Sequence, residues 1–531
     1  MKSRAREIAL FAFFVLASGL VLRPLPLHLG DRIPAGSDPP HHLYILSWLL
    51  DHGLSADRFE GRMFHPAKNA VLRSDLSMGT VVLMTPLAPF IADPLVRFNL
   101  ATWLALAFSG WAFCLLARSW TGSTVAGLFA GITAVLGSHQ SLHSVHLNLL
   151  SVGWLPIFLL ALDRLVISGS PGSSVLAGFS FALVASSSGY YGAAACVISL
   201  VFFARNPSRA GLKWGALAVL LALILLSPYL LAYASLHDQE NLVRTSRELA
   251  KGSWTLADVG SRTLLHRSWN AARGEPLFPG LAVFGLAVLA LARGGRLEKT
   301  LGLAVLLLFW LGIGEPGGLY RLLAVIPPFS SMRHPVTLTA VGLMLLSVIA
   351  AFGLARLAKE RALFGLLLLG IGIAETVPPP NDFFDVAPDV PAVYEAALEL
   401  PPGPILEIPP YEASALIWAA RRGFETVNGG GAFIPALTNR IETTIQNHWL
   451  TDSYQPIDES KAAGILLNET SMRYLILPAG RRGGLAPLLQ RFDSSRCFKP
   501  LGEYESDRLF EAVRDASCPA WAGIPSPGAS R

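Results

Sequence analysis

Long runs of apolar residues, separated by short polar links, fill most of the first 380 residues of the chain. A helix needs about 20 predominantly apolar residues to cross a bilayer, and most of these runs approach that length. The pattern therefore predicts a polytopic α-helical membrane protein with about eleven transmembrane helices. The runs lie near residues 8–22, 95–117, 123–140, 148–167, 174–189, 190–204, 214–234, 277–292, 299–313, 335–355 and 362–377.

Basic residues mark alternate links between these runs. Lysine and arginine gather, with few acids, at residues 118–122, 163–173, 205–213, 293–299 and 356–361. The positive-inside rule assigns these links and the N-terminus to the cytoplasm, and the chain after Pro378 to the outside. The first run follows Lys2, Arg4 and Arg6, as in a signal peptide, but further spans follow it and favour an uncleaved anchor.

The composition agrees with a membrane protein. Apolar residues make up 52% of the chain and charged residues 15%, whereas soluble domains carry about 25% charge. The net charge of +5 is small for this length, and no basic, aromatic-rich stretch suggests a nucleic-acid partner. Walker and G-x-S-x-G motifs are absent from the sequence, so nucleotide-driven transport has no support.

The composition changes at Pro378–Pro380. We expect a transmembrane domain over 1–380, an external α/β domain over 381–515 and a disordered tail over 516–531. Residues 405–409 and 474–478 predict buried strands, and residues near 434–450 and 457–467 predict helices. Residues 497–513 predict a hairpin that turns at 505–507.

The cysteines divide by environment. Cys114 and Cys196 lie in apolar runs and are expected to be inert. Cys497 begins the predicted hairpin and Cys518 follows its end, with Cys497 opposite about position 516. This spacing favours a disulfide in an oxidising compartment, and two unpaired thiols are the alternative.

The first external loop, residues 23–94, holds most of the candidate chemistry. Asp38 lies about fifteen residues beyond the first span, where its carboxylate is able to act as a base or to hold a divalent cation. The alternative is a cap for the helix expected at 41–52. Asp75 is likewise either a site residue or a cap for the next helix. His41 and His42 would point about 100° apart on a helix, which disfavours a shared metal.

Two further features suggest a cavity on the outer side. Residues 175–204 must cross the membrane twice with about thirty residues, so their polar turn, with Tyr190 and Tyr191, should lie below the surface. The tyrosines are candidates either for stacking on a sugar or for an interfacial belt. Arg333 lies at the mouth of a later span, and the external loop 235–276 is basic. That charge is either tolerated in a long loop or placed for an anionic ligand.

Three histidines are spaced for one helical face. His139, His143 and His146 fall at i, i+4 and i+7, a spacing that also occurs in metal sites. No nearby carboxylate in the sequence completes a zinc set, so a polar face that lines a cavity is favoured.

Several of these features together resemble a known family. The chain has an anchor helix, a long external loop with an early Asp, the segments Phe64-His65-Pro66 and Leu83-Met84-Thr85-Pro86-Leu87, and a span entered by Arg97-Phe98-Asn99. With the P-P-F-x-x-M-R-x-P segment that contains Arg333, this layout resembles the GT-C superfamily of membrane glycosyltransferases over roughly residues 1–380. The closest-looking branch is the bacterial protein-mannosyltransferase-like and aminoarabinose-transferase-like group.

The resemblance implies an enzyme that uses polyprenyl-phosphate sugars, with Asp38 as the base. Many members carry a tighter pair of acids after the first span, and here the neighbours are Asp31 and the pair His41 and His42. That departure leaves open both a divalent metal cofactor and a non-catalytic homologue.

The resemblance therefore implies a hexosyltransferase on the outer face of a bacterial cytoplasmic membrane, with a lipid, glycan or protein acceptor. Arg333 would stabilise the leaving phosphate. The other predicted substrate-binding residues are His41, His42, His65, Asp75, Tyr190 and Tyr191. The alternative is a transporter or scaffold in surface-polysaccharide assembly, although the inverted repeats of a transporter are not apparent in the sequence.

Overall fold

The computed structural model contains two compact units. It describes residues 2–53, 55–136, 143, 145–206, 208–261, 263–266, 268–270, 272, 274–326, 329–408, 414–445, 463–478, 492–515 and 517–518. The helical unit comprises residues 1–29, 75–89 and 99–382, and the sheet unit comprises residues 30–74, 90–98 and 383–531. Most of the first external loop therefore packs with the C-terminal region. The domain boundary predicted at residue 380 had assigned this loop to the transmembrane domain.

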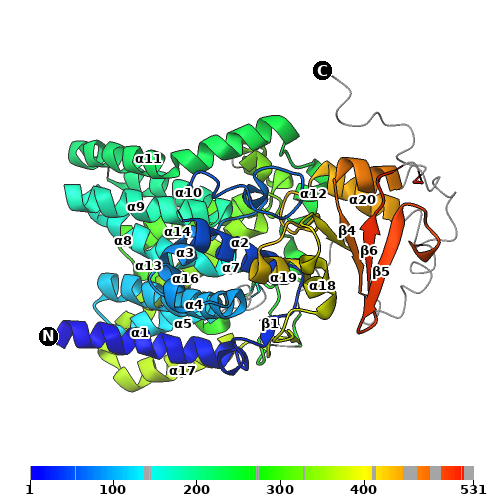
Figure 1. Ribbon diagram of the computed structural model, residues 1–531. Helices are drawn as coiled ribbons and strands as arrows, with labels where there is room; N and C mark the ends of the chain where they lie inside the picture. The colour runs from blue at the N-terminus through cyan, green and yellow to red at the C-terminus, as the bar shows by residue number, and fades with distance from the viewer. Residues whose placement is uncertain are drawn as a thin grey trace. The chain divides into compact units, whose positions relative to one another are not determined.

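The helical unit is built from apolar helices joined by short links (Figure 1). Its helices are α1 (Lys2–Val21), α3 (Met78–Met84), α4 (Pro94–Thr121, which begins in the sheet unit), α5 (Thr124–Leu136), α7 (Leu147–Leu150), α8 (Trp154–Ile167), α9 (Pro171–Ser187), α10 (Gly189–Arg205), α11 (Arg209–Glu240), α12 (Ser246–Lys251), α13 (Leu281–Arg293), α14 (Arg296–Gly312), α15 (Leu319–Leu323), α16 (Val336–Glu360) and α17 (Ala362–Thr376).

Each apolar run predicted from the sequence coincides with one of these helices. Four segments of the described chain are long and apolar enough to cross a membrane, namely 94–121, 147–167, 209–240 and 336–359. Several of the remaining helices are apolar but shorter. The membrane character is therefore supported, and the number of eleven spans stays a prediction.

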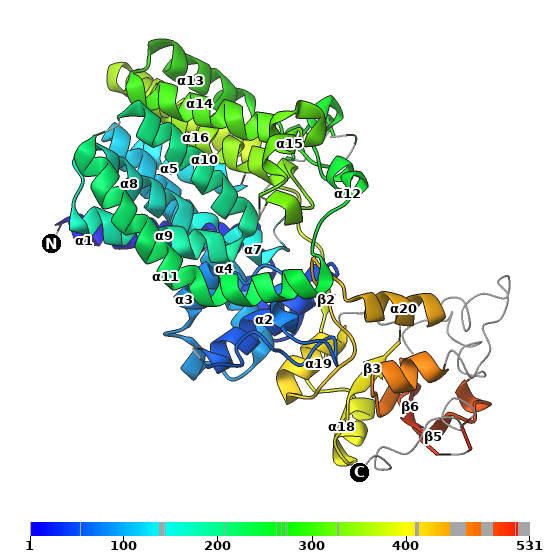
Figure 2. The same cartoon turned by 90° about the horizontal axis from the view of Figure 1, so that it is seen from above.

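Small residues allow the helices of this unit to approach closely. Helices α9 and α11 lie side by side, as do α13, α14 and α16 (Figure 2). At Gly178 of α9, an added Cβ atom would lie 2.6 Å from the carbonyl oxygen of Ala218 in α11. Only a glycine fits such an approach without displacing the backbone, a device common in membrane helix packing.

The sheet unit combines two small sheets with helices. Strand β1 (Arg32–Pro34) pairs antiparallel with β2 (Phe383–Asp385), so the start of the first loop is joined directly to the chain after the last helix. The second sheet has the order β3-β4-β6-β5, with β3 (Ile405–Glu407) parallel to β4 (Tyr474–Leu477) and the other pairs antiparallel. The helices are α2 (Asp38–His52), α18 (Ala392–Glu399), α19 (Ser414–Arg422) and α20 (Ala436–Ile445).

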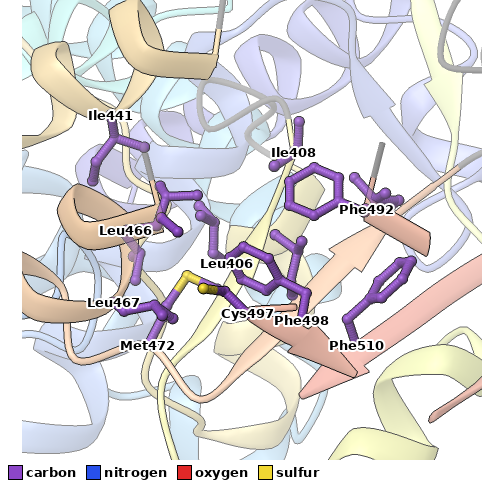
Figure 3. Close-up of a cluster of buried hydrophobic side chains, with 14 of the residues drawn as sticks. Leu406, Ile408, Ile441, Leu466, Leu467, Met472, Phe492, Cys497, Phe498 and Phe510 are labelled. Atoms are coloured by element: carbon purple, nitrogen blue, oxygen red, sulfur yellow. The ribbon is translucent and has the colours of Figure 1, made fainter. Parts of the chain in front are cut away.

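The predicted strands at 405–409 and 474–478 are confirmed as β3 and β4. Their side chains enter a buried core with Ile441 of α20, Leu466, Phe492 and Phe510 (Figure 3). The helix predicted at 434–450 is observed over Ala436–Ile445; it begins two residues later than predicted, and residues 446–450 lie outside the described residues, as does most of 457–467.

The predicted hairpin and disulfide are both present. Strands β5 (Phe498–Tyr504) and β6 (Asp507–Ala512) turn through Glu505 and Ser506, which both have positive φ. Cys497 is bonded to Cys518, with Cα atoms 4.6 Å apart. The expected register was wrong.

The amide of Val513 donates to the carbonyl of Cys497, so position 513 rather than 516 lies opposite this cysteine. The reason is a tighter turn than expected, through Glu505 and Ser506 only, together with a bulge between Pro500 and Gly502. Cys518 reaches its partner through a further turn, in which its amide donates to the carbonyl of Asp515.

Candidate active site

The two units hold separate sets of the predicted site residues. Asp38, His41, His42 and His65 belong to the sheet unit, and Asp75, Tyr190, Tyr191 and Arg333 belong to the helical unit.

The turn between α9 and α10 is very short. Helix α9 ends at Ser187 and α10 begins at Gly189, so Ser188 alone is extended between two 17-residue helices. Each helix rises about 1.5 Å per residue and is shorter than a full span requires. This geometry agrees with the sequence argument that the turn lies below the outer surface.

Asp75 binds this turn rather than the helix that follows it in sequence. The N-cap position of α3 is Ser77, so the alternative role of Asp75 as the cap of that helix is wrong. Its carboxylate accepts hydrogen bonds from the amide of Gly189 (3.2 Å), the hydroxyl of Ser188 (3.2 Å) and the side-chain amide of Asn148 (2.7 Å). The carboxylate therefore lies at the positive end of α10, where a negative charge is favourable.

Burial raises the pKa of Asp75, and the hydrogen bonds from Asn148, Gly189 and Ser188 act in the opposite direction. Keeping a buried carboxylate ionised at neutral pH costs free energy. Buried carboxylates with a raised pKa are common at functional sites. The sequence could not indicate these partners, because they lie more than seventy positions away along the chain.

Tyr190 and Arg333 come together at the start of α10. The phenolic oxygen of Tyr190 accepts hydrogen bonds from the backbone amides of Arg333 (3.3 Å) and His334 (3.1 Å). Arg333 is exposed, and its Nε donates to Nε2 of His334 at 2.9 Å. Tyr191 differs from its neighbour: it is buried, and its hydroxyl donates to the carbonyl of Leu149 at 2.6 Å. Stacking on a sugar is thus open to Tyr190, which is half-buried.

His334 was not singled out from the sequence. Burial, followed by the charge of the adjacent Arg333, lowers its pKa from 6.5 to about 4. The imidazole is therefore neutral at pH 7, and its Nε2 atom is available as an acceptor.

The expected helical face of histidines is not observed in the described residues. His143 lies in a turn and His146 has an extended backbone, while His139 lies outside the described residues. Nδ1 of His143 is 3.3 Å from Nδ1 of His146, and its Nε2 is 3.4 Å from a carboxylate oxygen of Glu275. Glu275 is the acid that the sequence did not place here. Among the described residues, no group of three or more His, Cys, Asp or Glu side chains is suited to a metal ion.

In the sheet unit, Asp38 opens helix α2, with Ser37 at the N-cap position and Pro39 and Pro40 in the first turn. His41 is buried and lies between two oxygen atoms. Its Nδ1 is 3.9 Å from Oδ1 of Asp38, and its Nε2 is 3.3 Å from Oγ of Ser74. The Asp38 side chain keeps 39% of its surface exposed, as a base that meets a substrate must.

His42 is also buried, and its ring centroid lies 4.2 Å from that of His41. The two rings therefore tilt together despite the different directions of their Cβ atoms along the helix. His65 is placed against a different partner, with its Nδ1 3.3 Å from a carboxylate oxygen of Glu425.

A glycine segment of the C-terminal region packs on His41. An added Cβ atom at Gly430 would lie 2.8 Å from Cβ of His41, and one at Gly431 would lie 3.0 Å from the carbonyl oxygen of Arg73. The preceding Asn428 is buried and bonds both the amide and the carbonyl of Glu407 in β3, each at 2.7 Å. Sequence reasoning missed this segment, although the Asn-Gly-Gly-Gly run is a local sign of close backbone approach.

No protein-family model matches the chain, and no curated protein matches its sequence. Solved structures do match. A cryo-EM structure of the arabinofuranosyltransferase AftD from mycobacteria has a TM-score of 0.57 at 16% identity, covering 97% of this chain and 42% of that chain. ArnT from Cupriavidus metallidurans, bound to undecaprenyl phosphate, has a TM-score of 0.53 at 14% identity, covering 96% of this chain and 98% of that one.

The archaeal oligosaccharyltransferase AglB from Archaeoglobus fulgidus, in complex with an inhibitory peptide and a dolichol-phosphate, has a TM-score of 0.53 at 12% identity. It covers 99% of this chain and 75% of that chain. The chain thus spans less than half the length of AftD, and nearly the whole of ArnT. At these identities the likeness concerns the fold, and the chain has the GT-C fold of these membrane glycosyltransferases. The resemblance drawn from the sequence is confirmed at that level.

Proposed function

We propose that the protein is a GT-C glycosyltransferase that moves a sugar, a hexose in our proposal, from a polyprenyl-phosphate donor to an acceptor hydroxyl. The observation that carries the proposal is the exposed guanidinium of Arg333. His334 bonds this guanidinium, and Tyr190 bonds the backbone that carries it, in a fold whose solved neighbours include proteins bound to undecaprenyl phosphate and dolichol-phosphate. The acceptor is a lipid, a glycan or a protein.

In the proposed reaction Asp38 takes the proton of the acceptor hydroxyl. The acceptor oxygen forms a bond to the anomeric carbon of the sugar as the bond from that carbon to the phosphate oxygen breaks. The leaving polyprenyl phosphate keeps the electron pair, and Arg333 stabilises the charge that develops on it through a forked pair of N–H groups. His41 and His42 lie next to Asp38, and Tyr190 holds the backbone that carries Arg333.

A divalent metal does not enter these steps. His41 lies beside Asp38, with its Nδ1 3.9 Å from Oδ1 of Asp38, whereas hard divalent cations prefer several oxygen ligands. Among the described residues, no group of three or more His, Cys, Asp or Glu side chains is suited to a metal ion, so we propose no metal-dependent step.

We also propose that the active side faces away from the cytoplasm in a bacterial inner membrane. The distribution of lysine and arginine across the short links supports this orientation. A periplasm-dependent reporter fused after Ser517 should be active, and the same reporter fused at Gly294 should be silent. The reverse pattern would overturn the orientation.

Transfer of label from radiolabelled polyprenyl-phosphate sugars by the purified protein in detergent tests the activity. Asp38→Asn should reduce transfer to below a few per cent, because a general base contributes about 100-fold or more. Its melting should hardly change, since the side chain is partly exposed. Asp57→Asn is the matched control: Asp57 is an exposed acid of the same loop, bonded to Ser55, and its replacement should leave transfer intact.

Arg333 gives a second test of the same proposal. Arg333→Ala should weaken donor binding more than acceptor binding, and Arg333→Lys should restore only part of it because the fork is lost. Equal activity of the three forms would mean that this arginine has a structural role only. If the wild-type protein bound donors but transferred no sugar, the non-catalytic alternative would be favoured.

A further inference from the structure

The backbone that carries Arg333 is held at two points within the helical unit. Two consecutive amides, those of Arg333 and His334, donate to the single phenolic oxygen of Tyr190. Just after α12, the carbonyl of Gly252 accepts a hydrogen bond from the amide of Val336 at 3.0 Å. An added Cβ atom at Gly252 would lie 2.7 Å from Cα of His334 and would overlap the carbonyl oxygen of Arg333. The segment 333–336 is therefore tightly confined.

The side chain of Arg333 is oriented as well. Its Nε–H is always a donor, so the bond to Nε2 of His334 at 2.9 Å requires a neutral imidazole with its proton on Nδ1. With Nε occupied in this way, the two terminal NH₂ groups of the exposed guanidinium remain to meet a ligand. Fixing a long side chain before binding reduces the conformational entropy that binding would otherwise cost.

Tyr190 is itself anchored from the other end. The residue before it, Gly189, donates its amide to Asp75, and Ser188 donates its hydroxyl to the same carboxylate. Asp75 therefore fixes the start of α10, and the start of α10 fixes the phenol. The contacts form one series that runs from a buried carboxylate to the segment of Arg333.

We propose that Tyr190 is a positioning residue for Arg333: its phenolic oxygen holds the backbone of residues 333 and 334 so that the guanidinium faces the phosphate of the lipid donor. This rests on the proposed function, in which Arg333 binds that phosphate. Tyr190 then acts through hydrogen bonds to the backbone, and stacking of its ring on a sugar is not required.

Binding of undecaprenyl phosphate, without a sugar, to the full-length protein in detergent tests the proposal. Tyr190→Phe keeps the ring and removes the acceptor, and it should weaken this binding about tenfold, because two hydrogen bonds to the segment are lost. The KM for the lipid-linked donor should rise and kcat should fall, because Arg333 also stabilises the charge that develops on the leaving phosphate, while the KM for the acceptor stays nearly unchanged. In the Arg333→Ala background, Tyr190→Phe should have no further effect.

Two controls separate positioning from general destabilisation. Tyr474→Phe removes a tyrosine hydroxyl bond of 2.7 Å to the carbonyl of Pro401 in the sheet unit, and it should leave lipid-phosphate binding unchanged. Gly252→Ala should displace the Arg333 segment from its second contact and reproduce the selective loss. Gly370→Ala, where an added Cβ atom meets nothing within 4 Å, should not.

The outcomes distinguish this inference from the function on which it rests. Wild-type affinity in Tyr190→Phe would overturn it, and so would an equal loss in the Arg333→Ala background, which would mean that Tyr190 contacts the donor independently. Failure of the wild-type protein itself to bind undecaprenyl phosphate would refute the proposed function, and the inference with it.

Discussion

Acidification should destabilise the helical unit through His334. The pKa of this histidine falls from 6.5 to about 4 on folding, first because of burial and then because of the charge of Arg333. Between these values the unfolded chain binds a proton that the folded protein does not. Stability therefore rises with pH across this window, and it is lost as the pH falls from about 6.5 toward 4.

The size of the effect follows from the two pKa values. A shift from 6.5 to about 4 corresponds to about 3 kcal/mol once both states are protonated, and to about 2 kcal/mol at pH 5. Other charges face the same imidazole: Glu275 raises its pKa, whereas His143 and His146 lower it. Protonation would also remove the acceptor of the Arg333 Nε–H bond, so donor binding should weaken in the same window.

The assay compares thermal unfolding of the wild-type protein and of His334→Gln in detergent at pH 7.5 and pH 5.0. Glutamine offers an acceptor oxygen but does not titrate, so the variant should lose less stability on acidification, by about 2 kcal/mol or a few degrees in Tm. The comparison of the two proteins at two pH values isolates the part of the pH dependence that comes from residue 334. An identical loss in the two proteins would refute the reasoning, because His334 would then not be the group that titrates.

Two further predictions concern the sheet unit. Replacing Cys497 and Cys518 by alanine should weaken the region of β5 and β6 by about 3 kcal/mol, given the sequence separation of 21 residues. Amide hydrogen exchange there should become on the order of a hundredfold faster, and unchanged exchange would show that the bond contributes nothing. Gly430→Ala should push His41 away, since the new Cβ atom would lie 2.8 Å from that of the histidine. We expect a fall of about tenfold in kcat with donor affinity retained; a normal kcat would exclude a role for this contact, with Gly370→Ala as the control.

Local patterns in the sequence were sufficient for the elements. Apolar length located each long helix to within a few residues, and buried β-branched and leucine-rich runs located β3 and β4. The polar turn between two alternating segments located the hairpin, and with it the pairing of Cys497 and Cys518. These properties depend on neighbours along the chain, so a single sequence contains them.

The composition of the candidate site depended on contacts between distant segments. The sequence singled out Asp75, but only the fold places it at the start of α10 rather than at the helix that follows it. Only the fold brings Glu275 to His143, or Gly430 to His41. These partners lie more than a hundred positions apart, and no local periodicity records such a pairing. The sequence by itself thus determined which segments form helices and strands and which polar residues were available, whereas tertiary packing decided which of them meet and in which protonation state.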